Sequence, residues 1–180
     1  ALCALASSID TVSTERVHEE LTRILTEGGA ATGTQLLMDS GLMAALLPEV
    51  AAMEGVPQPP EYHPEGDVWV HVKLMLSELD RADEVTPELA WAVLLHDIGK
   101  GKAIKGHCET GAEMAAAVLD RSGYPGDQKD NILFVIRNHL KMARIWRRHD
   151  IDAHQTIRNF AEEVATEERL RLLYVHAYCD

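Results

Sequence analysis

Two side chains that can bind a metal stand next to each other near the middle of this chain. His96 and Asp97 end an apolar run, and a glycine and Lys100 follow closely. Neutral imidazole and carboxylate groups both suit a divalent transition metal. Two ligands do not fill a coordination sphere. Any chemistry at this doublet therefore depends on side chains that other segments bring to it.

Two further residues are expected to complete the set. His71 lies within an apolar helical pattern, where a histidine on its own is more often a buried core residue than a ligand. Beside a helix that ends at His96 and Asp97, it becomes a candidate third ligand. A fourth is expected from Asp180, at the end of an apolar helix. The predicted metal ligands are therefore His71, His96, Asp97 and Asp180, with positions left open for water and substrate.

Helices are expected throughout the chain, because apolar residues recur at helical spacing and no segment alternates convincingly with a period of two. Ser13 is predicted to cap the first long helix, Asp67 the helix that carries His71, and Pro87 to begin the helix that ends at the doublet. A mobile, glycine-containing loop is expected after the doublet. Later helices are expected over about residues 107–121, 127–137, 152–165 and 166–179. The fold class predicted is all-α.

A proline-rich segment divides the chain. Residues 54–66 contain four prolines, which exclude a helix or a central strand. We predict a junction there between a helical neck, residues 1–53, and a main domain, residues 67–180. His63 in this segment is predicted to lie in a solvated loop. His149, His154 and His176 are predicted to lie outside the site.

The distribution of charge limits the anionic partners. The formal net charge is −12, and residues 1–90 hold 4 Lys or Arg against 16 Asp or Glu. A surface that coats nucleic acid generally is therefore not expected. One basic cluster, Arg137–Arg148, has Arg137, Lys141, Arg144 and Arg148 at spacings that would share one helix face, with Trp146 among them. It is a candidate RNA-backbone patch, and the alternative is a solvated face that pairs with the acidic half.

Composition also bears on location. The three cysteines are scattered and form no Cys-x-x-Cys pair, so neither a disulfide framework nor a zinc ribbon is indicated, and a cytoplasmic setting is expected. No apolar run approaches the roughly 18 residues of a membrane span, so no membrane partner is expected. The first residue is not Met, from which we expect a fragment of a longer protein.

The order of these motifs resembles the HD superfamily of metal-dependent phosphohydrolases. The run His-Asp-Ile-Gly-Lys at residues 96–100 matches that family's doublet, and residues 106–112 and 137–139 resemble its second and third histidine segments. The resemblance implies a helical bundle around a divalent metal (Mn, Fe, Ni, Co, Zn or Mg) that activates water for attack on a phosphoester. It implies a catalytic role for Asp97, phosphate contact by Lys100, and site positions for His107 and His139.

A second resemblance covers essentially the whole chain. Residues 13–21, 40–42, 47–49 and 58–71 are similar to the neck and following segment of bacterial class II tRNA nucleotidyltransferases and poly(A) polymerases. Enzymes of that family carry a head with a Gly-Gly phosphate-binding segment and an Asp-x-Asp metal pair. Here Gly28-Gly29 has no Asp-x-Asp behind it, and the only Asp-x-Asp is at residues 150–152. We therefore expect the neck plus HD portion, without the polymerase head.

Two functions are consistent with these patterns. The first is an HD phosphohydrolase site in a tRNA nucleotidyltransferase-like protein, acting on small phosphoesters, cyclic nucleotides or RNA 2′,3′-cyclic phosphate ends. The alternative is an inert RNA-binding or scaffolding module of the same family. A free-standing HD protein with a neck-like start is a third possibility.

Overall fold

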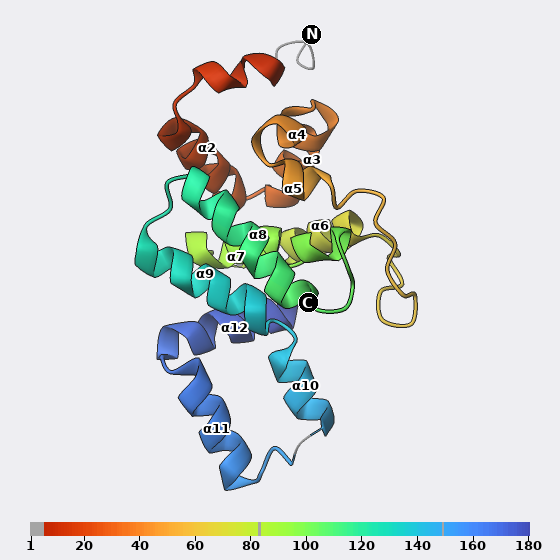
Figure 1. Cartoon of the computed structure of the whole chain (residues 1–180), viewed down its shortest axis with the longest axis vertical. Helices are drawn as coiled ribbons and strands as arrows, with labels where there is room; N and C mark the ends of the chain where they lie inside the picture. The colour runs from red at the N-terminus through yellow and green to blue at the C-terminus, as the bar shows by residue number, and fades with distance from the viewer. Residues whose placement is uncertain (1–5, 83, 149) are drawn as a thin grey trace.

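Helices make up the fold, as predicted. The computed structural model describes residues 6–82, 84–148 and 150–180, and within these ranges no strand is present beyond one isolated bridge between Pro57 and Asp67. In Figure 1 the first helices lie at one end of the molecule, α6 to α9 in the middle, and α10 and α11 at the other end. The helices of the first part are η1 (Ala6–Thr11), α2 (Thr14–Thr26), α3 (Ala30–Asp39), α4 (Leu42–Leu46) and α5 (Pro48–Ala51). Those of the second part are α6 (Val68–Leu79), α7 (Pro87–Leu95), η2 (Ile98–Gly101), α8 (His107–Arg121), α9 (Gly126–Asn138), α10 (Lys141–Arg148), α11 (His154–Val164) and α12 (Glu167–Cys179).

Side-chain caps fix several of the helix starts. The Ser13 hydroxyl accepts from the Arg16 amide at 3.5 Å, and Asp67 accepts from the Val70 amide at 3.0 Å. Thr86 and Thr166 cap α7 and α12 in the same way. Each cap satisfies one of the free amides at a helix start and contributes about 1 kcal/mol. The predicted caps at Ser13 and Asp67 are confirmed.

Helix α7 is the centre of the core. Every residue from Leu89 to Leu95 is buried, so this helix has no solvent face, and α2, α6, α9 and α12 pack around it. The indole of Trp91 lies fully inside and donates through Nε1 to the Thr22 hydroxyl of α2 at 3.0 Å. Because α7 is buried along its length, its C-terminal end delivers His96 and Asp97 to the interior.

The first helices share this core rather than standing apart. Leu21, Leu25 and Met43 belong to the same cluster of buried apolar residues as α7. The Asp80 carboxylate accepts from the Ala30 amide at 2.8 Å and so caps α3 from the end of α6. The neck and the main domain are therefore joined by burial as well as by the chain.

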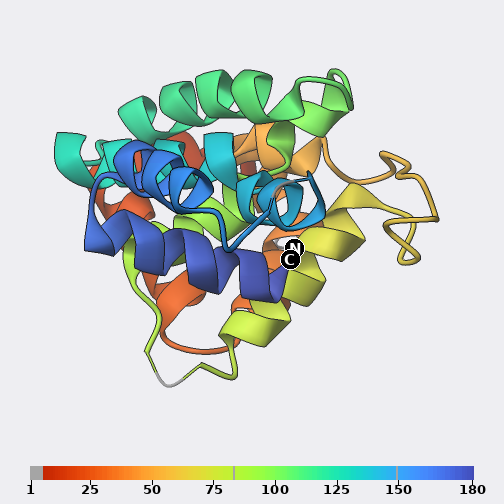
Figure 2. The same ribbon diagram turned by 90° about the horizontal axis from the view of Figure 1, so that it is seen from below.

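The proline-rich segment, residues 54–66, is an ordered loop that extends from one side of the helical body in both Figure 1 and Figure 2. Its base is closed by hydrogen bonds from the Gln58 amide to the Gly66 carbonyl at 2.9 Å and from the Val68 amide to the Val56 carbonyl at 3.0 Å. Asp67 also accepts from the Gly55 amide at 2.7 Å. The segment is thus tied to the start of α6, which carries His71.

One local prediction is wrong, and another holds only for residues 102–106. The basic residues expected on one helix face are divided between two helices, because α9 ends at Asn138 and α10 begins at Lys141. The loop expected after the doublet begins as the 3₁₀ helix η2, which packs against α8. Among the described residues, no helix has both the length and the apolar character that crossing a bilayer requires.

Gly99 allows the close contact between η2 and α8. A Cβ at this position would lie 2.3 Å from the His107 carbonyl oxygen and 2.7 Å from the Gly111 amide nitrogen. Both atoms belong to the backbone, so neither can move aside without displacing α8. Gly126, at the start of α9, has open space around the same position.

We therefore expect Gly99→Ala to lower the free energy of unfolding by about 1–3 kcal/mol, as overpacking does. The matched change Gly126→Ala should leave it unchanged or slightly raised. Urea denaturation of the metal-free variants measures both. Equal midpoints for Gly99→Ala and the unsubstituted chain would contradict the packing role of Gly99.

Candidate metal centre

His96 and Asp97 lie at the end of α7 with no exposed surface. The Nδ1 of His96 lies 2.9 Å from the Val93 carbonyl oxygen, which can only accept, so Nδ1 carries the proton. The other ring nitrogen, Nε2, is then an acceptor, and it lies 3.2 Å from Oδ2 of Asp97, which is also an acceptor. His96 Nε2 and Asp97 Oδ1 have no hydrogen-bond donor among the described residues, and Asp97 Oδ2 faces the ammonium of Lys100. Two buried acceptors at this distance repel one another unless a proton or a cation lies between them.

Two more histidines repeat this arrangement. His107 begins α8 and has Nδ1 2.7 Å from the Ile104 carbonyl, and His139 follows α9 and has Nδ1 2.8 Å from the Ile136 carbonyl. Their Nε2 atoms lie 3.3 Å from each other and 3.4 and 3.8 Å from Oδ1 of Asp97. All three histidines therefore turn an unprotonated nitrogen toward one carboxylate, that of Asp97.

His71 approaches the doublet from α6. Its ligating nitrogen lies within 4.8 Å of ligand atoms of both His96 and Asp97, as a shared metal requires. Asp180, at the end of α12, has Oδ1 3.0 Å from His71 Nε2. The structure thus brings the four predicted ligands into one neighbourhood, three as a mutual group and Asp180 through His71.

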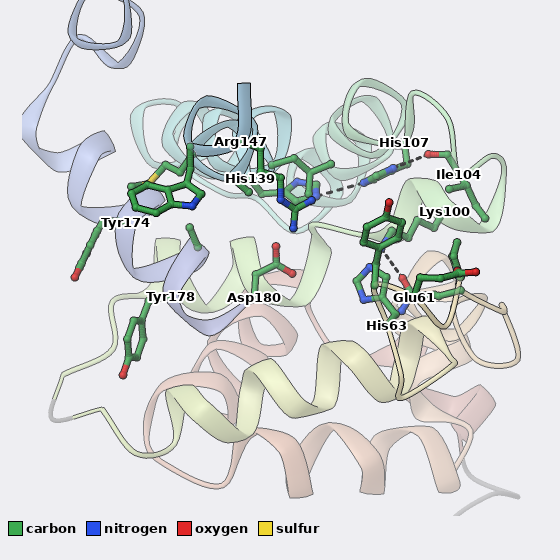
Figure 3. Close-up of a pocket in the computed structure, with 18 residues that line it drawn as sticks. Glu61, His63, Lys100, Ile104, His107, His139, Arg147, Tyr174, Tyr178 and Asp180 are labelled. Atoms are coloured by element: carbon green, nitrogen blue, oxygen red, sulfur yellow. Dashed lines mark hydrogen bonds between the residues drawn. The ribbon is translucent and has the colours of Figure 1, made fainter. Parts of the chain in front are cut away.

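Lys100 is not a solvated loop lysine. Its Nζ lies 2.6 Å from Oδ2 of Asp97 and donates to the Gln58 side-chain oxygen at 2.5 Å, and the side chain is 8% exposed. Because Gln58 belongs to the proline-rich segment, this contact joins that segment to the site. Lys100 and His139 both line one cavity, and both are labelled in Figure 3.

Two histidines that the sequence placed outside the site belong to it. His176 on α12 is fully buried, with its ring centroid 5.0 Å from His96 and 5.8 Å from His139, and neither of its nitrogens has a hydrogen-bond partner in the described part of the chain. Its spacing of four residues before Asp180 places both on one helix face and was the available signal. His63 is half-buried and packs its ring 4.8 Å from His71. His154 is exposed, as expected, and His149 lies outside the described residues.

Burial and charge set the protonation states of the site. Burial lowers the pKa of His139 to about 4, and burial also lowers the pKa of His107 and that of His176. Burial would lower the pKa of His96 as well, but the adjacent Asp97 carboxylate raises it. Burial opposes ionisation of Asp97, yet His96 and Lys100 hold the pKa of that carboxyl well below its usual range. At neutral pH the imidazoles of His107 and His139 are therefore neutral and face the Asp97 carboxylate, a donor set that fits a divalent metal.

A cavity of about 900 Å³ opens beside these groups. Figure 3 shows Asp180 and Arg147 pointing into it from α12 and α10, with His63 and Lys100 on the other side. Among the described residues, no hydrogen bond or ion pair involves the Arg147 guanidinium. The aromatic side chains that line the cavity are Tyr62, Trp146, Tyr174 and Tyr178.

Comparison with known proteins places this geometry in a family. Residues 67–177 match the model of the HD domain. The chain belongs to the HD domain family. Residues 1–54 match a second model, described as the probable RNA and SrmB-binding site of polymerase A.

Its curated relatives are multifunctional CCA proteins of bacteria. The protein of Azoarcus sp. is 34% identical over 96% of this chain and 43% of its own length. That of Halorhodospira halophila is 38% identical over 80% of this chain and 37% of its own length, and that of Thioalkalivibrio sulfidiphilus 36% over 74% and 34%. The chain thus spans roughly two fifths or less of the relatives it matches, and the recognised combination of neck and HD domain is confirmed.

Because several histidines are buried, we expect the stability of the metal-free protein to depend on pH. A histidine whose pKa is lower in the folded state binds fewer protons there than in the unfolded chain, whose pKa is near 6.5. Stability should therefore fall as the pH is lowered from 7 to 5, although His96, whose pKa is raised, acts in the opposite sense.

Replacing His176 should reduce this dependence. We expect His176→Leu to flatten the loss by at most about 1.4 kcal/mol per pH unit, the contribution of one proton. The exposed control His154→Leu should behave as the unsubstituted chain does. Urea midpoints at pH 7, 6 and 5 measure the effect, and an identical slope in His176→Leu would show that His176 is not held neutral.

Proposed function

We propose that this site holds a divalent metal ion through His71, His96, Asp97 and Asp180 and hydrolyses phosphoesters. The observation that carries the proposal is a pair of buried acceptors, His96 Nε2 and Asp97 Oδ1, that have no hydrogen-bond donor among the described residues, beside an Oδ2 that faces Lys100 Nζ at 2.6 Å. A buried polar atom without a partner costs about 1–3 kcal/mol. A cation at this point would satisfy both of these acceptors at once.

The donor set leaves the metal identity open among Mn, Fe, Ni, Co, Zn and Mg, since imidazole and carboxylate suit most of them. When bound, a divalent ion supplies a Lewis acid that polarises a phosphoryl oxygen and acidifies water. His107 and His139 line the cavity with neutral Nε2 atoms that can accept a hydrogen bond from a bound water or substrate. The Lys100 ammonium lines the same cavity and is placed to contact a phosphate oxygen.

The cavity supports a nucleotide or an RNA end as the substrate. Tyr62 and Trp146 offer exposed aromatic faces on two walls, and stacking of a base on such a face is worth about 1–3 kcal/mol. Arg147 supplies a guanidinium for a second phosphate. The match of the neck to a model described as an RNA-binding site supports RNA as the partner, and tRNA in a cytoplasmic setting is part of the proposal.

Addition of nucleotides is proposed to belong to the part of the relatives that this chain does not span. Gly28 and Gly29 form the turn between α2 and α3, both with positive φ, and Asp80 already caps the helix that follows. The Asp80 carboxylate at that helix start would therefore repel an anion. Nothing in this turn supports binding of a nucleotide phosphate.

The second candidate is an RNA-binding module with a structural site. It is favoured by the basic helix α10, on which Arg144, Arg147 and Arg148 are exposed. Lys141 instead forms an ion pair with Glu163. The two candidates differ in whether the protein binds metal and turns over a phosphoester.

Asp97→Asn tests the leading proposal. The amide keeps the shape of the side chain and removes its charge, so bound metal should be lost and phosphodiester turnover should fall to the background. Asp130→Asn, an exposed change on α9, should alter neither. Metal content by mass spectrometry and hydrolysis of bis-p-nitrophenyl phosphate measure the two effects. No bound metal and equal background in all three proteins would favour the structural module.

Arg147→Ala tests the nature of the substrate. If Arg147 contacts a second phosphate, KM for a dinucleotide with a terminal 2′,3′-cyclic phosphate should rise about tenfold, the equivalent of roughly 1.4 kcal/mol. The KM for bis-p-nitrophenyl phosphate should stay the same. Arg148→Ala, one position along and outside the cavity, is the control. Equal changes for both substrates would instead indicate a general loss of the site.

A further inference from the structure

His71 is oriented differently from the other histidines of the site. His96, His107 and His139 each direct Nδ1 to a backbone carbonyl three residues earlier. The Nδ1 of His71 instead lies 2.8 Å from Oε1 of Glu65, a side chain of the proline-rich segment. Its Nε2 faces Asp180 at 3.0 Å. Glu65 thus takes the place at His71 that a main-chain carbonyl takes at the others.

Glu65 is itself held in place. The same oxygen lies 3.0 Å from Nδ1 of His63, and the side chain is 13% exposed. Burial opposes ionisation of Glu65, but a backbone hydrogen bond and the two imidazoles lower its pKa, so it is a carboxylate that accepts. The backbone bonds that close the base of the loop fix its position relative to α6.

We propose that Glu65 is a positioning residue for the metal centre, acting through His71, and that His63 holds Glu65. The carboxylate keeps the proton of His71 on Nδ1 and leaves the Nε2 lone pair facing the site. Carboxylates that accept from a ligating histidine fix its orientation and make it more basic, and their loss typically costs 10–100-fold in metal affinity. The inference rests on the proposed metal site and assigns the proline-rich segment a part in building it.

A direct metal site at this cluster is the rival arrangement. Ligand atoms of His63, Glu65 and His71 lie within 4.8 Å of one another. However, Oε1 of Glu65 already faces two imidazole nitrogens at hydrogen-bond distance, and one histidine would have to serve two ions at once. The positioning role needs no rearrangement of these contacts.

The test compares Glu65→Leu, Glu65→Gln and a control on the same segment, Glu54→Leu, whose side chain is exposed. Zn²⁺ is the probe. Calorimetry should give a 10–100-fold weaker Kd for Glu65→Leu and a smaller loss for Glu65→Gln, because the amide oxygen still accepts from Nδ1. Glu54→Leu should bind as the unsubstituted chain does. Circular dichroism of the metal-free proteins confirms that each variant is folded.

A second measurement does not depend on metal. In the metal-free protein with ¹⁵N-labelled histidine, the proton on His71 Nδ1 should be protected from exchange with water and lose that protection in Glu65→Leu. An unchanged Kd or an unchanged Nδ1 proton in Glu65→Leu overturns the positioning role. So does the loss of one whole Zn²⁺ ion from the stoichiometry, which would make Glu65 a ligand. If the unsubstituted chain binds no Zn²⁺ while the Nδ1 result is as expected, the proposed function fails and the contact between Glu65 and His71 stands.

Discussion

The fully buried carboxylate of Asp97 constrains how the interior of this protein is arranged. Removing an ionised carboxylate from water costs several kcal/mol unless charges and hydrogen-bond donors surround it. Asp97 meets this condition through the Lys100 ammonium on η2, and the acceptor nitrogens of His96, His107 and His139, which come from the ends of α7, α8 and α9, leave room beside it for a second cation. The packing of these elements around the core is thus also the arrangement that makes the buried charge tolerable.

The ends of helices fix the orientation of the histidine rings in the site. The last four carbonyls of an α-helix have no partner within the helix. His96 and His139 each follow the last residue of their helix, and each uses one of these free carbonyls, that of Val93 or of Ile136, to fix its ring. One contact therefore satisfies the helix terminus and sets the histidine tautomer. The break between α9 and α10 leaves the Ile136 carbonyl available to His139, whereas in a continuous helix that carbonyl would accept from the backbone four residues later.

This explains which features could be predicted from the sequence. Caps such as Ser13 and Asp67 follow from local rules that act over a few residues, whereas the meeting of His71 with His96 and Asp97 could be predicted because both helices are apolar and must face a common interior. The spacing of the basic residues alone suggests one continuous helix, although the helix end expected near residue 137 already argues against it, and α9 does end at Asn138. Glu65 was missed because proline and polar residues suggest a solvated loop, whereas backbone hydrogen bonds fold that loop onto α6.

The same electrostatics bear on the choice between an active and a structural site. A module that only bound RNA would be more stable with apolar residues in its interior, because well-packed apolar side chains often replace buried charges without loss. Here the interior instead holds His176, whose two nitrogens have no hydrogen-bond partner in the described structure, beside the unsatisfied acceptors of His96 and Asp97. These buried groups also lie beside the cavity, because His139, Lys100 and Asp180 next to them line it. A purely structural site would bear the cost of these buried groups without needing the cavity, whereas a metal centre that takes substrates needs both.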